Sequence, residues 1–519
     1  MTDLRLATAR NGEPTAILGT RHLHSRVAPG EEALRFVRQC VDRRYHLVLV
    51  IGPGLGHCYA PFRQLLPGAR LIGLSLSGAL SSAQHARPDG SWDPETGEPL
   101  ADFLTRELSD LDSSSVLVVE WPPTVAALPQ TAEMVRAEVT AHLRRAHSSL
   151  VTQGASGRRW LRNQVFNFSR ATPVTLSRTG AGVCAAVLVG AGPSAEQTLP
   201  RLRSMRDRLE LWITSSALDT TIRHGLRPDV IVVTDAALYA GEHLRPVVCG
   251  RLRDTPVAAP LSATRAISRC RRLALLAEGD VVDQELFSRA GLSPPLIPPH
   301  GTVSATAAAL IRSTGDLPIV CTGIDFAWCC ERSHARPHLS EVYRRASASR
   351  LQPEQTQVYA IVRTHTRLDE RWTTSPSLLA YSEWFRSVGR SRFAPIHSLQ
   401  PSPAIGLTTE IAPAVLDSLE PKYGRVTAGA LSPPGERERE DVVRRTIDDL
   451  LEAVRMAAPP DHPRDLESSA PVFAALAVRL ALPELLRWYR SDAHDDRVRW
   501  DEVRMTVEEE LRSTREQIA

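Results

Sequence analysis

Short apolar runs alternate with longer helical stretches in the first part of the chain. The runs at residues 45–51, 70–74 and 115–119 have the length and the mainly apolar character of buried strands, and residues 134–151 have apolar positions at helical spacing. Such alternation is typical of a parallel sheet with helices on its faces. We therefore expect residues 1–150 to form a small α/β domain.

A longer block repeats this pattern. Residues 158–170 carry aromatic and aliphatic side chains that we expect to pack between domains, and residues 195–208 have the pattern of a helix. The strands expected in this block are 185–189, 211–214, 230–234, 255–259 and 318–322. They predict that residues 151–400 form a central Rossmann-like domain around a parallel sheet.

The remainder of the chain changes character twice. Residues 401–439 are rich in Pro, Gly, Ser and charged residues, which is typical of a connector. Residues 440–519 have apolar positions at helical spacing, for example Val443 and Ile447. We expect a helical C-terminal region, in which Pro483 kinks or divides one apolar stretch.

Composition narrows the class of protein. The 519 residues exceed one ordinary core, and 43% hydrophobic with 23% charged residues is typical of globular proteins. The net charge of +3 is small, and we see no basic stripe with interleaved aromatics, so we do not expect the protein to bind nucleic acid. We see no apolar run suited to a signal peptide or a membrane span, and the 8 scattered cysteines suit reduced thiols. We therefore expect a cytoplasmic protein.

A first glycine-rich loop, GPGLG at residues 52–56, follows the first strand. Its glycines allow a ligand to approach the backbone, and the helix that follows favours an anion. Dinucleotide and S-adenosylmethionine sites usually add an acidic residue at the end of the second strand, but here Leu74 and Ser77 bound a segment without a carboxylate. We interpret the loop as a tight structural turn, with a degenerate cofactor pocket as the alternative.

A second loop, GAGPS, follows the first strand of the central domain. Gly190 and Gly192 lack the Cβ atoms that would block a phosphate or a ribose. Ser194 is placed to cap the following helix, and Gln197 completes the spacing of a capping box. This motif alone is weak, and a capped turn without a ligand is the alternative.

Polar residues also follow the next two strands. Thr214, Ser215 and Ser216 stand where a nicotinamide site would place an acid, about 20 residues after the glycines, so we disfavour NAD. These hydroxyls can instead bond a base or a sugar. Asp235 ends the next strand, at the edge where α/β sheets bind ligands, and can contact a ribose, a base amine or a metal ion. An Asp in this position equally often caps the next helix.

A third block reads HGTVSATAAAL and then IVCTGIDFAW. Gly301, Thr302 and Ser304 open a helix whose free N–H groups and hydroxyls form an anion site, and the alanines of that helix are expected to pack close to the sheet. The following strand ends at Gly323 and Asp325. We expect the buried carboxylate to brace loops by accepting backbone N–H bonds, in preference to direct chemistry.

Two histidines are candidate general bases. His334 lies beyond the last motif, and His365 follows a strand-like run at residues 358–362. Imidazole titrates near neutrality and can take a proton from a hydroxyl, although a histidine without a special role is the commoner explanation for each. Cys329 and Cys330 with nearby histidines lack the CxxC spacing of a metal site, so we predict no metal site.

Together, GAGPS, GLRPD…VVTDA, HGTVSATAAAL and GIDFAW…SHA resemble the motility-accessory-factor (Maf) family, bacterial proteins associated with flagellin glycosylation. The resemblance covers roughly residues 150–400 and, more loosely, the GPGLGH unit. The central domain of that family is similar to bacterial sialyltransferases and to archaeal 6-hydroxymethylpterin diphosphokinase. The implied nucleotide-sugar contacts are Gly190, Gly192, Pro193, Ser194, Ser215, Ser216, Asp235, Gly301, Thr302, Ser304 and Gly323. The candidate catalytic residues are His334, His365 and Asp325.

The resemblance implies a glycosyltransferase that moves a nonulosonic, sialic-acid-like sugar from a CMP-sugar to Ser or Thr of flagellin, in support of flagellar assembly and motility. Its partners would be flagellin and the nucleotide sugar, and direct displacement requires no cofactor. One alternative is pyrophosphoryl transfer from ATP to a pterin alcohol, with Mg²⁺ held by carboxylates such as Asp235. Another is a non-enzymatic flagellin chaperone or adaptor that binds through the C-terminal helices.

Overall fold

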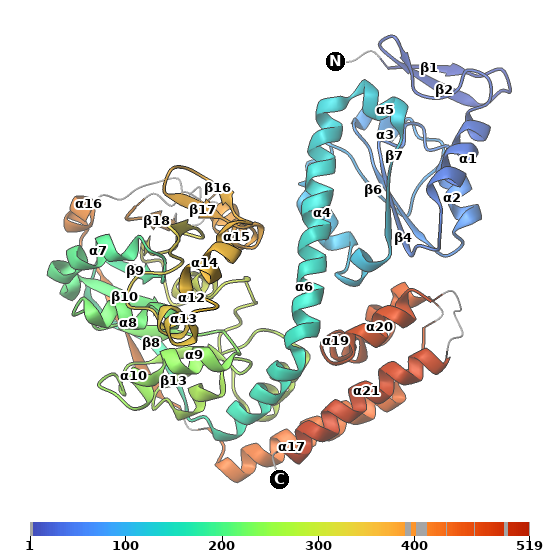
Figure 1. Ribbon diagram of the computed structural model, residues 1–519. Coiled ribbons are helices and arrows are strands. Elements are labelled where there is room, and N and C mark those ends of the chain that lie inside the picture. The colour runs from blue at the N-terminus through green and yellow to red at the C-terminus, as the bar shows by residue number, and fades with distance from the viewer. Residues whose placement is uncertain are drawn as a thin grey trace. The chain divides into compact units, whose positions relative to one another are not determined.

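The chain divides into two compact units in its computed structural model (Figure 1). The structure describes residues 4–389, 396–400, 413–431, 433–460, 462–491 and 497–517. Unit 1 consists of Met1–Arg158 and Leu450–Leu511, and unit 2 of Arg159–Asp449 and Arg512–Ala519. The helices from Leu450 onward therefore group with the N-terminal α/β part. Residues 401–412 and 432 of the expected connector lie outside the described residues.

A four-stranded parallel sheet forms the centre of unit 1. Its order is β6-β5-β4-β7, with strands at Gly90–Trp92, Arg70–Leu74, Leu47–Ile51 and Val116–Glu120. Leu49 and Ile51 of β4 pack into a core on one face of the sheet, and Val48 and Val50 pack into another core on the opposite face. Because both faces of β4 are buried, its sequence is an uninterrupted apolar run. The three strands predicted in this part are confirmed.

Helices surround this sheet, and an antiparallel three-stranded sheet precedes it in the chain. The small sheet consists of β1 (Leu4–Thr8), β2 (Pro14–Leu18) and β3 (Arg21–His22). The helices are α1 (Pro29–Cys40), α2 (Tyr59–Leu65), α3 (Gly78–Ser82), α4 (Leu100–Glu107) and α5 (Pro122–Ala127).

One long helix, α6 (Pro129–Arg170), replaces the helix and the bridging segment that the sequence suggested separately. Its interior contains no proline, so nothing breaks the backbone ladder before its end. Two glycines of this helix lie where a later segment of the same chain packs closely against it. A Cβ on Gly154 would overlap Leu482, and a Cβ on Gly157 would overlap Arg479.

The C-terminal region is helical, as predicted. Pro483 lies in the first turn of α20, directly after the break that separates α20 from α19, so the expected division of this apolar stretch is confirmed. Along the described residues, no helix combines the length and the apolar character needed to cross a membrane. The helices are α17 (Glu436–Met456), α18 (Leu466–Ser469), α19 (Pro471–Leu480), α20 (Leu482–Tyr489) and α21 (Arg497–Glu516).

Unit 2 is built on a nine-stranded sheet with the order β18-β14-β9-β10-β11-β12-β13-β8-β19. All neighbouring strands are parallel except β19, which runs antiparallel to β8. The Rossmann-like parallel-sheet fold is therefore confirmed. The strands are β8 (Pro173–Val183), β9 (Ala185–Val189), β10 (Leu209–Thr214), β11 (Val230–Val232), β12 (Val257–Pro260), β13 (Leu273–Leu276), β14 (Ile319–Thr322), β18 (Ile396–Ser398) and β19 (Tyr423–Ala430).

The strand order reverses direction at β9. From β9 the chain proceeds through β10, β11, β12 and β13 on one side, and β14 then pairs with the other side of β9. Open α/β sheets bind their ligands at the carboxyl ends of the strands beside such a switch point. The GAGPS loop follows β9 and the TGID loop follows β14, so both predicted motifs lie at this point of the sheet.

Helices and a small antiparallel sheet complete unit 2. Residues 358–362, read from the sequence as strand-like, belong to helix α14, because Pro353 and Glu354 start a helix there. The helices are α7 (Ala195–Leu202), α8 (Leu218–Arg223), α9 (Leu238–His243), α10 (Arg245–Val248), α11 (Val281–Arg289), α12 (Val303–Ser313), α13 (Leu339–Ser347), α14 (Glu354–Val362), α15 (Pro376–Gly389) and α16 (Pro413–Ser418). The small sheet has the order β15-β17-β16, with strands Trp328–Cys329, Trp372–Thr374 and Thr366–Arg367.

Candidate functional site

The loops after β9 and β14 contact each other through their backbones. Gly190 N donates to Thr322 O at 2.8 Å, and Gly192 N donates to Gly323 O at 2.7 Å. A Cβ on Gly190 would overlap Gly323 O, and a Cβ on Gly192 would lie 2.5 Å from Asp325 Oδ2. The two glycines are thus required for one loop to approach the other. This packing does not test the predicted contact of the two glycines with a nucleotide, which stays a prediction.

Asp325 joins these loops through its carboxylate. It is 3% exposed and accepts hydrogen bonds from Ser194 N at 2.9 Å and from Ser194 Oγ at 2.5 Å. Ser194 Oγ in turn accepts from Gly323 N at 3.2 Å. The expected bracing contact between Asp325 and loop backbone is therefore present. Burial raises the pKa of Asp325 to about 6, although the bonds from Ser194 act in the opposite direction.

The predicted capping box at Ser194 and Gln197 is wrong. Ser194 precedes α7, but its side chain makes no capping hydrogen bond, because its hydroxyl is directed to Asp325. The Gln197 amide accepts from Gln400 Nε2 at 3.1 Å. Ser194 and Gln197 therefore form hydrogen bonds with segments that are distant in the chain, and not with the backbone at the start of α7.

The start of α12 has the expected conformation. Thr302 is the N-cap residue, and its Oγ1 accepts from Ala305 N at 3.1 Å. Gly301 has φ +79, a left-handed conformation that favours glycine, and Ser304 is buried at the first turn. Alanines of α12, among them Ala305 and Ala308, lie in one core with Leu188 and Trp212 of the sheet, as expected for close packing.

Aromatic side chains of α15 lie beside this helix start, and the sequence did not identify them. A Cβ on Gly301 would lie 3.9 Å from Tyr381 Cδ1, and the ring of His300 lies 5.2 Å from that of Trp384. Tyr381 is 44% exposed. The spacing of three residues between Tyr381 and Trp384 was the available signal, because it places both on one face of a helix.

The remaining strand ends carry the predicted polar groups. β10 ends at Thr214, whose Oγ1 lies 3.2 Å from Ser216 Oγ, and Ser215 is buried beside them. Asp235 is exposed beyond β11, and its Oδ1 accepts from Ala237 N at 2.7 Å. Asp235 is not the residue that caps α9, since Ala237 occupies that position. Asp235 therefore presents its carboxylate at the carboxyl edge of the sheet.

Two asparagines of α6 hold the neighbouring loops at this edge and were also missed. Asn167 Nδ2 donates to Leu261 O and Ala263 O, both at 2.9 Å, after β12. Asn163 Nδ2 donates to Ala236 O at 3.2 Å, after β11. Buried loops need such partners for their carbonyl groups, so these amides fix the backbone next to Asp235. Nothing in the local sequence connects a helix to loops so far along the chain.

His334 belongs to a cluster of three histidines beside the GAGPS loop. Its ring stacks on that of His338 with centroids 3.7 Å apart and planes 1° from parallel, and His243 of α9 lies 5.2 Å from His338. Ala335 N donates to Ala191 O at 2.8 Å, which ties this segment to the glycine loop. Face-to-face rings do not direct their in-plane lone pairs at one ion, and no metal-binding group of three or more ligands occurs among the described residues.

The cluster keeps its rings neutral. Burial, followed by repulsion from His243, lowers the pKa of His334 to about 4, and burial lowers that of His338 to about 2. Ser340 N donates to His338 Nδ1 at 3.2 Å, so the proton of the neutral ring is on Nε2. A neutral imidazole is the form that accepts a proton, and His334 has this form at neutral pH.

We expect this burial to make stability depend on pH. Unfolded histidines take up protons near pH 6.5, whereas folded His334 stays neutral to about pH 4. Stability present above pH 6.5 is therefore lost as pH falls through this window, by on the order of 3 kcal/mol for His334. The melting temperature of His334→Gln should fall less between pH 7 and pH 5 than that of wild type. Equal slopes for wild type, His334→Gln and the exposed control His22→Gln would contradict this assignment.

His365, the other candidate base, lies against different residues. Its ring is 5.2 Å from that of Trp328, and its Nδ1 lies 3.4 Å from Thr373 Oγ1. His365 follows α14 and precedes β16, and is only partly buried. The structure thus brings His334, and not His365, into a segment bonded to the GAGPS loop.

The first glycine loop is filled by side chains of its own unit. A Cβ on Gly54 would overlap the ring of His24, and a Cβ on Gly52 would lie 3.1 Å from Leu76 Cδ1. His24 Nε2 also accepts from Leu55 N at 2.9 Å. This packing agrees with the interpretation of the loop as a tight structural turn.

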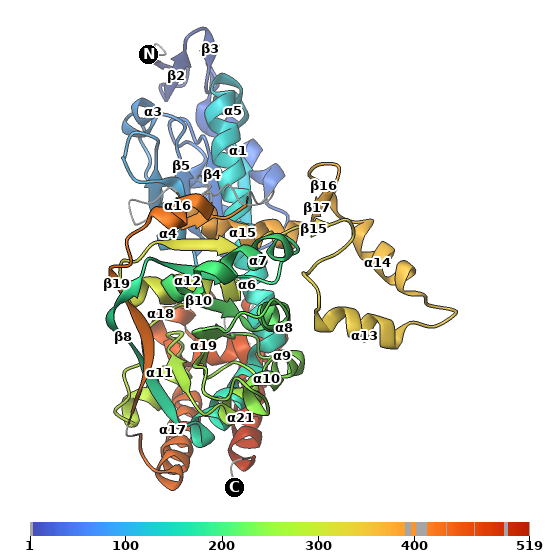
Figure 2. The ribbon, with the colours of Figure 1, turned by 90° about the vertical axis from the view of Figure 1, so that its left-hand side faces the viewer.

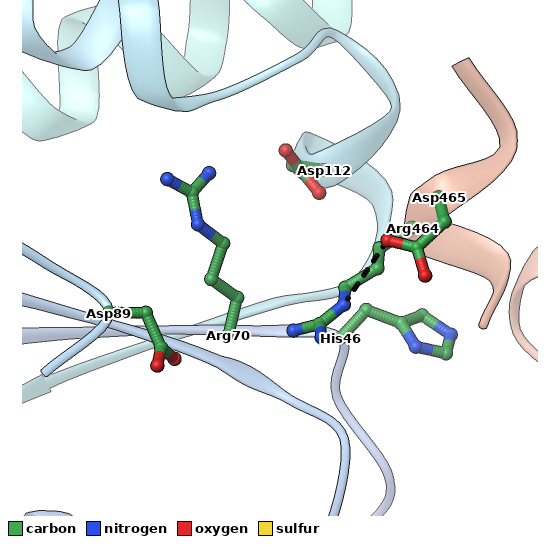
Figure 3. Close-up of a pocket in the computed structure, with 6 residues that line it drawn as sticks. All are labelled: His46, Arg70, Asp89, Asp112, Arg464 and Asp465. Carbon is green, nitrogen blue, oxygen red and sulfur yellow. Dashed lines mark ion pairs between the residues drawn. The ribbon is translucent and has the colours of Figure 1, made fainter. Parts of the chain in front are cut away.

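A cavity of about 440 Å³ opens in unit 1 (Figure 3). Its lining residues are His46, Arg70, Asp89, Asp112, Arg464 and Asp465. His46 precedes β4 and Arg70 begins β5, so the cavity lies at the amino ends of these strands. Ligands of α/β sheets bind at the opposite, carboxyl edge, and the lining carboxylate of Asp89 already accepts from Leu71 N at 2.8 Å. The position of the cavity therefore does not favour a ligand site there.

Known proteins match this chain over different lengths. Residues 158–331 match the family model described as 6-hydroxymethylpterin diphosphokinase MptE-like. A Treponema pallidum (strain Nichols) protein described only as uncharacterized is 26% identical over 301 residues, which are 57% of this chain and 63% of that protein. The chain thus spans less than two thirds of this relative.

The fold of the whole chain is that of a solved Maf protein. The structure of the Maf glycosyltransferase from Magnetospirillum magneticum AMB-1 aligns with a TM-score of 0.59 at 12% identity, covering 100% of this chain and 92% of the other. The resemblance to the Maf family drawn from the motifs, with an MptE-like central domain, is therefore confirmed at the level of fold.

Proposed function

We propose that this chain is a glycosyltransferase that moves a nonulosonic, sialic-acid-like sugar from a CMP-sugar to Ser or Thr of flagellin in the cytoplasm. One observation carries the proposal: the GAGPS loop, at the switch point of a sheet with the Maf fold, is hydrogen-bonded to the segment that carries neutral His334. A nucleotide-binding loop beside a proton acceptor is what sugar transfer from a nucleotide donor requires.

In this mechanism the nucleotide lies over the carboxyl ends of β9, β10 and β14. The loop Gly190–Ser194 and the hydroxyls of Ser215 and Ser216 hold the nucleoside, and the Gly301–Ser304 helix start holds the phosphate. The positive end of the α12 dipole stabilises the phosphate as negative charge develops on it. No metal or other cofactor is required for this step.

The transfer is a direct displacement at the anomeric carbon. An acceptor hydroxyl forms the new C–O bond while the bond to the phosphate oxygen breaks, and CMP leaves with the electron pair. His334 takes the hydroxyl proton, with His365 as the second candidate. The phosphate of a bound nucleotide also raises the pKa of a nearby imidazole, which brings His334 closer to the range of an effective base.

A second candidate function is favoured by the MptE-like match of residues 158–331. Pyrophosphoryl transfer from ATP to a pterin alcohol would use Mg²⁺ held by carboxylates. Asp235 is the residue suited to that role, because it is exposed at the carboxyl edge of the sheet and only one of its oxygens carries a backbone bond.

Calorimetric titration of the purified chain separates these candidates. We expect CMP to bind saturably without added metal, and a CMP-sugar to compete with it. Absence of CMP binding at millimolar concentration contradicts the glycosyltransferase proposal. Magnesium-dependent binding of ATP, without binding of CMP, supports the pterin diphosphokinase. If the chain binds neither CMP nor ATP, the result supports the adaptor function.

A further inference from the structure

Helices α13 and α14 form an arm that projects from the rest of unit 2 (Figure 2). Every residue from 342 to 370 is exposed or only partly buried, and α14 fully buries none of its side chains. A short helix that fully buries none of its side chains obtains little stabilisation from packing within the chain. Its composition must therefore be explained by something outside the described fold.

Large apolar side chains are concentrated on this arm. Leu351 is 84% exposed, Tyr359 69% and Val342 58%. The set continues onto α9, where Leu238 is 82% exposed, and the ring of Tyr239 lies 5.1 Å from that of Tyr343 on α13. Large exposed apolar side chains gathered on neighbouring elements, with tyrosines among them, are typical of surfaces that bind another protein. We define the arm surface as Leu238, Tyr239, Val342, Tyr343, Leu351 and Tyr359.

The charge around the arm surface is positive. From 339 to 363 the chain carries four arginines and two glutamates. Glu354 lies 3.9 Å from both Arg344 and Arg345. Arg350 and Arg363 are exposed, and neither side chain has an ion pair or hydrogen bond among the described residues. These two guanidinium groups are available to a partner, and they favour one with carboxylates.

The arm surface begins at the histidine cluster. His338 caps α13, because its Nδ1 accepts a hydrogen bond from Ser340 N. The face of the same ring stacks on His334. His243, the last residue of α9, lies 5.2 Å from His338. Of the three helices that carry the arm surface, α9 and α13 therefore meet the cluster at one end. A partner held at this end of the arm surface is close to the residue proposed to take the acceptor proton.

We propose that the arm surface docks the protein that receives the sugar, through a segment of that protein with acidic and apolar side chains. This inference rests on the proposed function and adds the place where the acceptor binds. A bilayer fits less well, because the exposed apolar residues come from α9, α13, α14 and the turn between them and do not form one continuous amphipathic helix face.

Direct binding of flagellin from the same organism tests the proposal with two double variants. Leu351→Ser with Tyr359→Ser removes apolar contacts, and Arg350→Glu with Arg363→Glu reverses charge. Because these side chains are exposed, we expect folding to be unaffected, and flagellin affinity to fall about tenfold or more in each. CMP affinity reports the donor site and should not change. Met456→Ser with Arg437→Glu is the control for exposed residues of the same kinds elsewhere.

Each outcome decides one of the two proposals. Unchanged flagellin affinity in both arm variants overturns the docking inference, and the glycosyltransferase proposal stands if CMP still binds. Loss of flagellin binding in the arm variants supports the docking inference even if wild type fails to bind CMP, which counts only against the donor assignment. If the arm variants keep their flagellin affinity but change the mass measured by light scattering, the occupant is a second copy of this chain. If they keep it but change binding to anionic phospholipid vesicles, the occupant is a membrane. Either result overturns the docking inference.

Discussion

His334→Gln should lower kcat for sugar transfer by about 10²- to 10⁴-fold while the affinity for CMP stays close to that of wild type. The reason is that the variant removes the group that takes the acceptor proton. It leaves the GAGPS loop intact, because Ala335 N bonds to Ala191 O through the backbone. Initial-rate measurements with a CMP-sugar and flagellin, together with CMP titration, check this result.

The control for His334 is the exposed histidine His22, whose replacement by glutamine should leave kcat unchanged. A His334→Gln variant with wild-type kcat would exclude His334 as the base. In that case His365→Gln becomes the decisive variant, since His365 is the other candidate. A rise in KM for flagellin with unchanged kcat would instead indicate that His334 acts in acceptor binding.

Gly192→Val should destabilise unit 2 by about 2–4 kcal/mol and abolish CMP binding. A Cβ at this position lies 2.5 Å from Asp325 Oδ2 and 2.7 Å from Gly323 O, so the two loops must separate. Separation also breaks the bonds that Asp325 accepts from Ser194, which leaves a buried carboxylate with fewer partners. Chemical denaturation and CMP titration of the same preparation measure both effects.

Gly435→Val is the matched control for Gly192, because no heavy atom lies within 4 Å of a Cβ placed there. Its free energy of unfolding should lie within about 1 kcal/mol of that of wild type, since the main cost is that valine begins α17 less well than glycine, and it should bind CMP normally. If Gly192→Val retained wild-type stability, the loop-to-loop contact would not be tight. If it lost stability but bound CMP with wild-type affinity once folded, the GAGPS loop would not be part of the nucleotide site.

The parallel strands could be predicted where they are buried on both faces. β4 and β9 are uninterrupted apolar runs, and β5 is apolar after Arg70, because helices and chain cover both sides of the sheet. β8 is buried only at its two ends and is partly buried or exposed between them, and β19 is made largely of small residues, so neither gave such a signal. β19 lies in the expected connector and is held by its pairing with β8.

The strand-like reading of residues 358–362 shows the limit of short patterns. Residues 358–362 are apolar and β-branched enough to suggest a strand, but they are the end of α14. A run of that length does not distinguish the two periods, and the helix start at Pro353 was the better signal.

The sequence by itself determined the class of fold, the two glycine motifs at strand ends and the capped start of α12, because these depend on residues that are close together in the chain. The tertiary structure decided how the motifs are used. It placed Gly190 against Gly323, directed Ser194 to Asp325, and stacked His334 on His338 beside His243. The physical reason is that backbone clearance, buried hydrogen bonds and ring stacking depend on distances between segments far apart in the chain. Those distances are set by the order of strands in the sheet and by how the loops and helices pack on it.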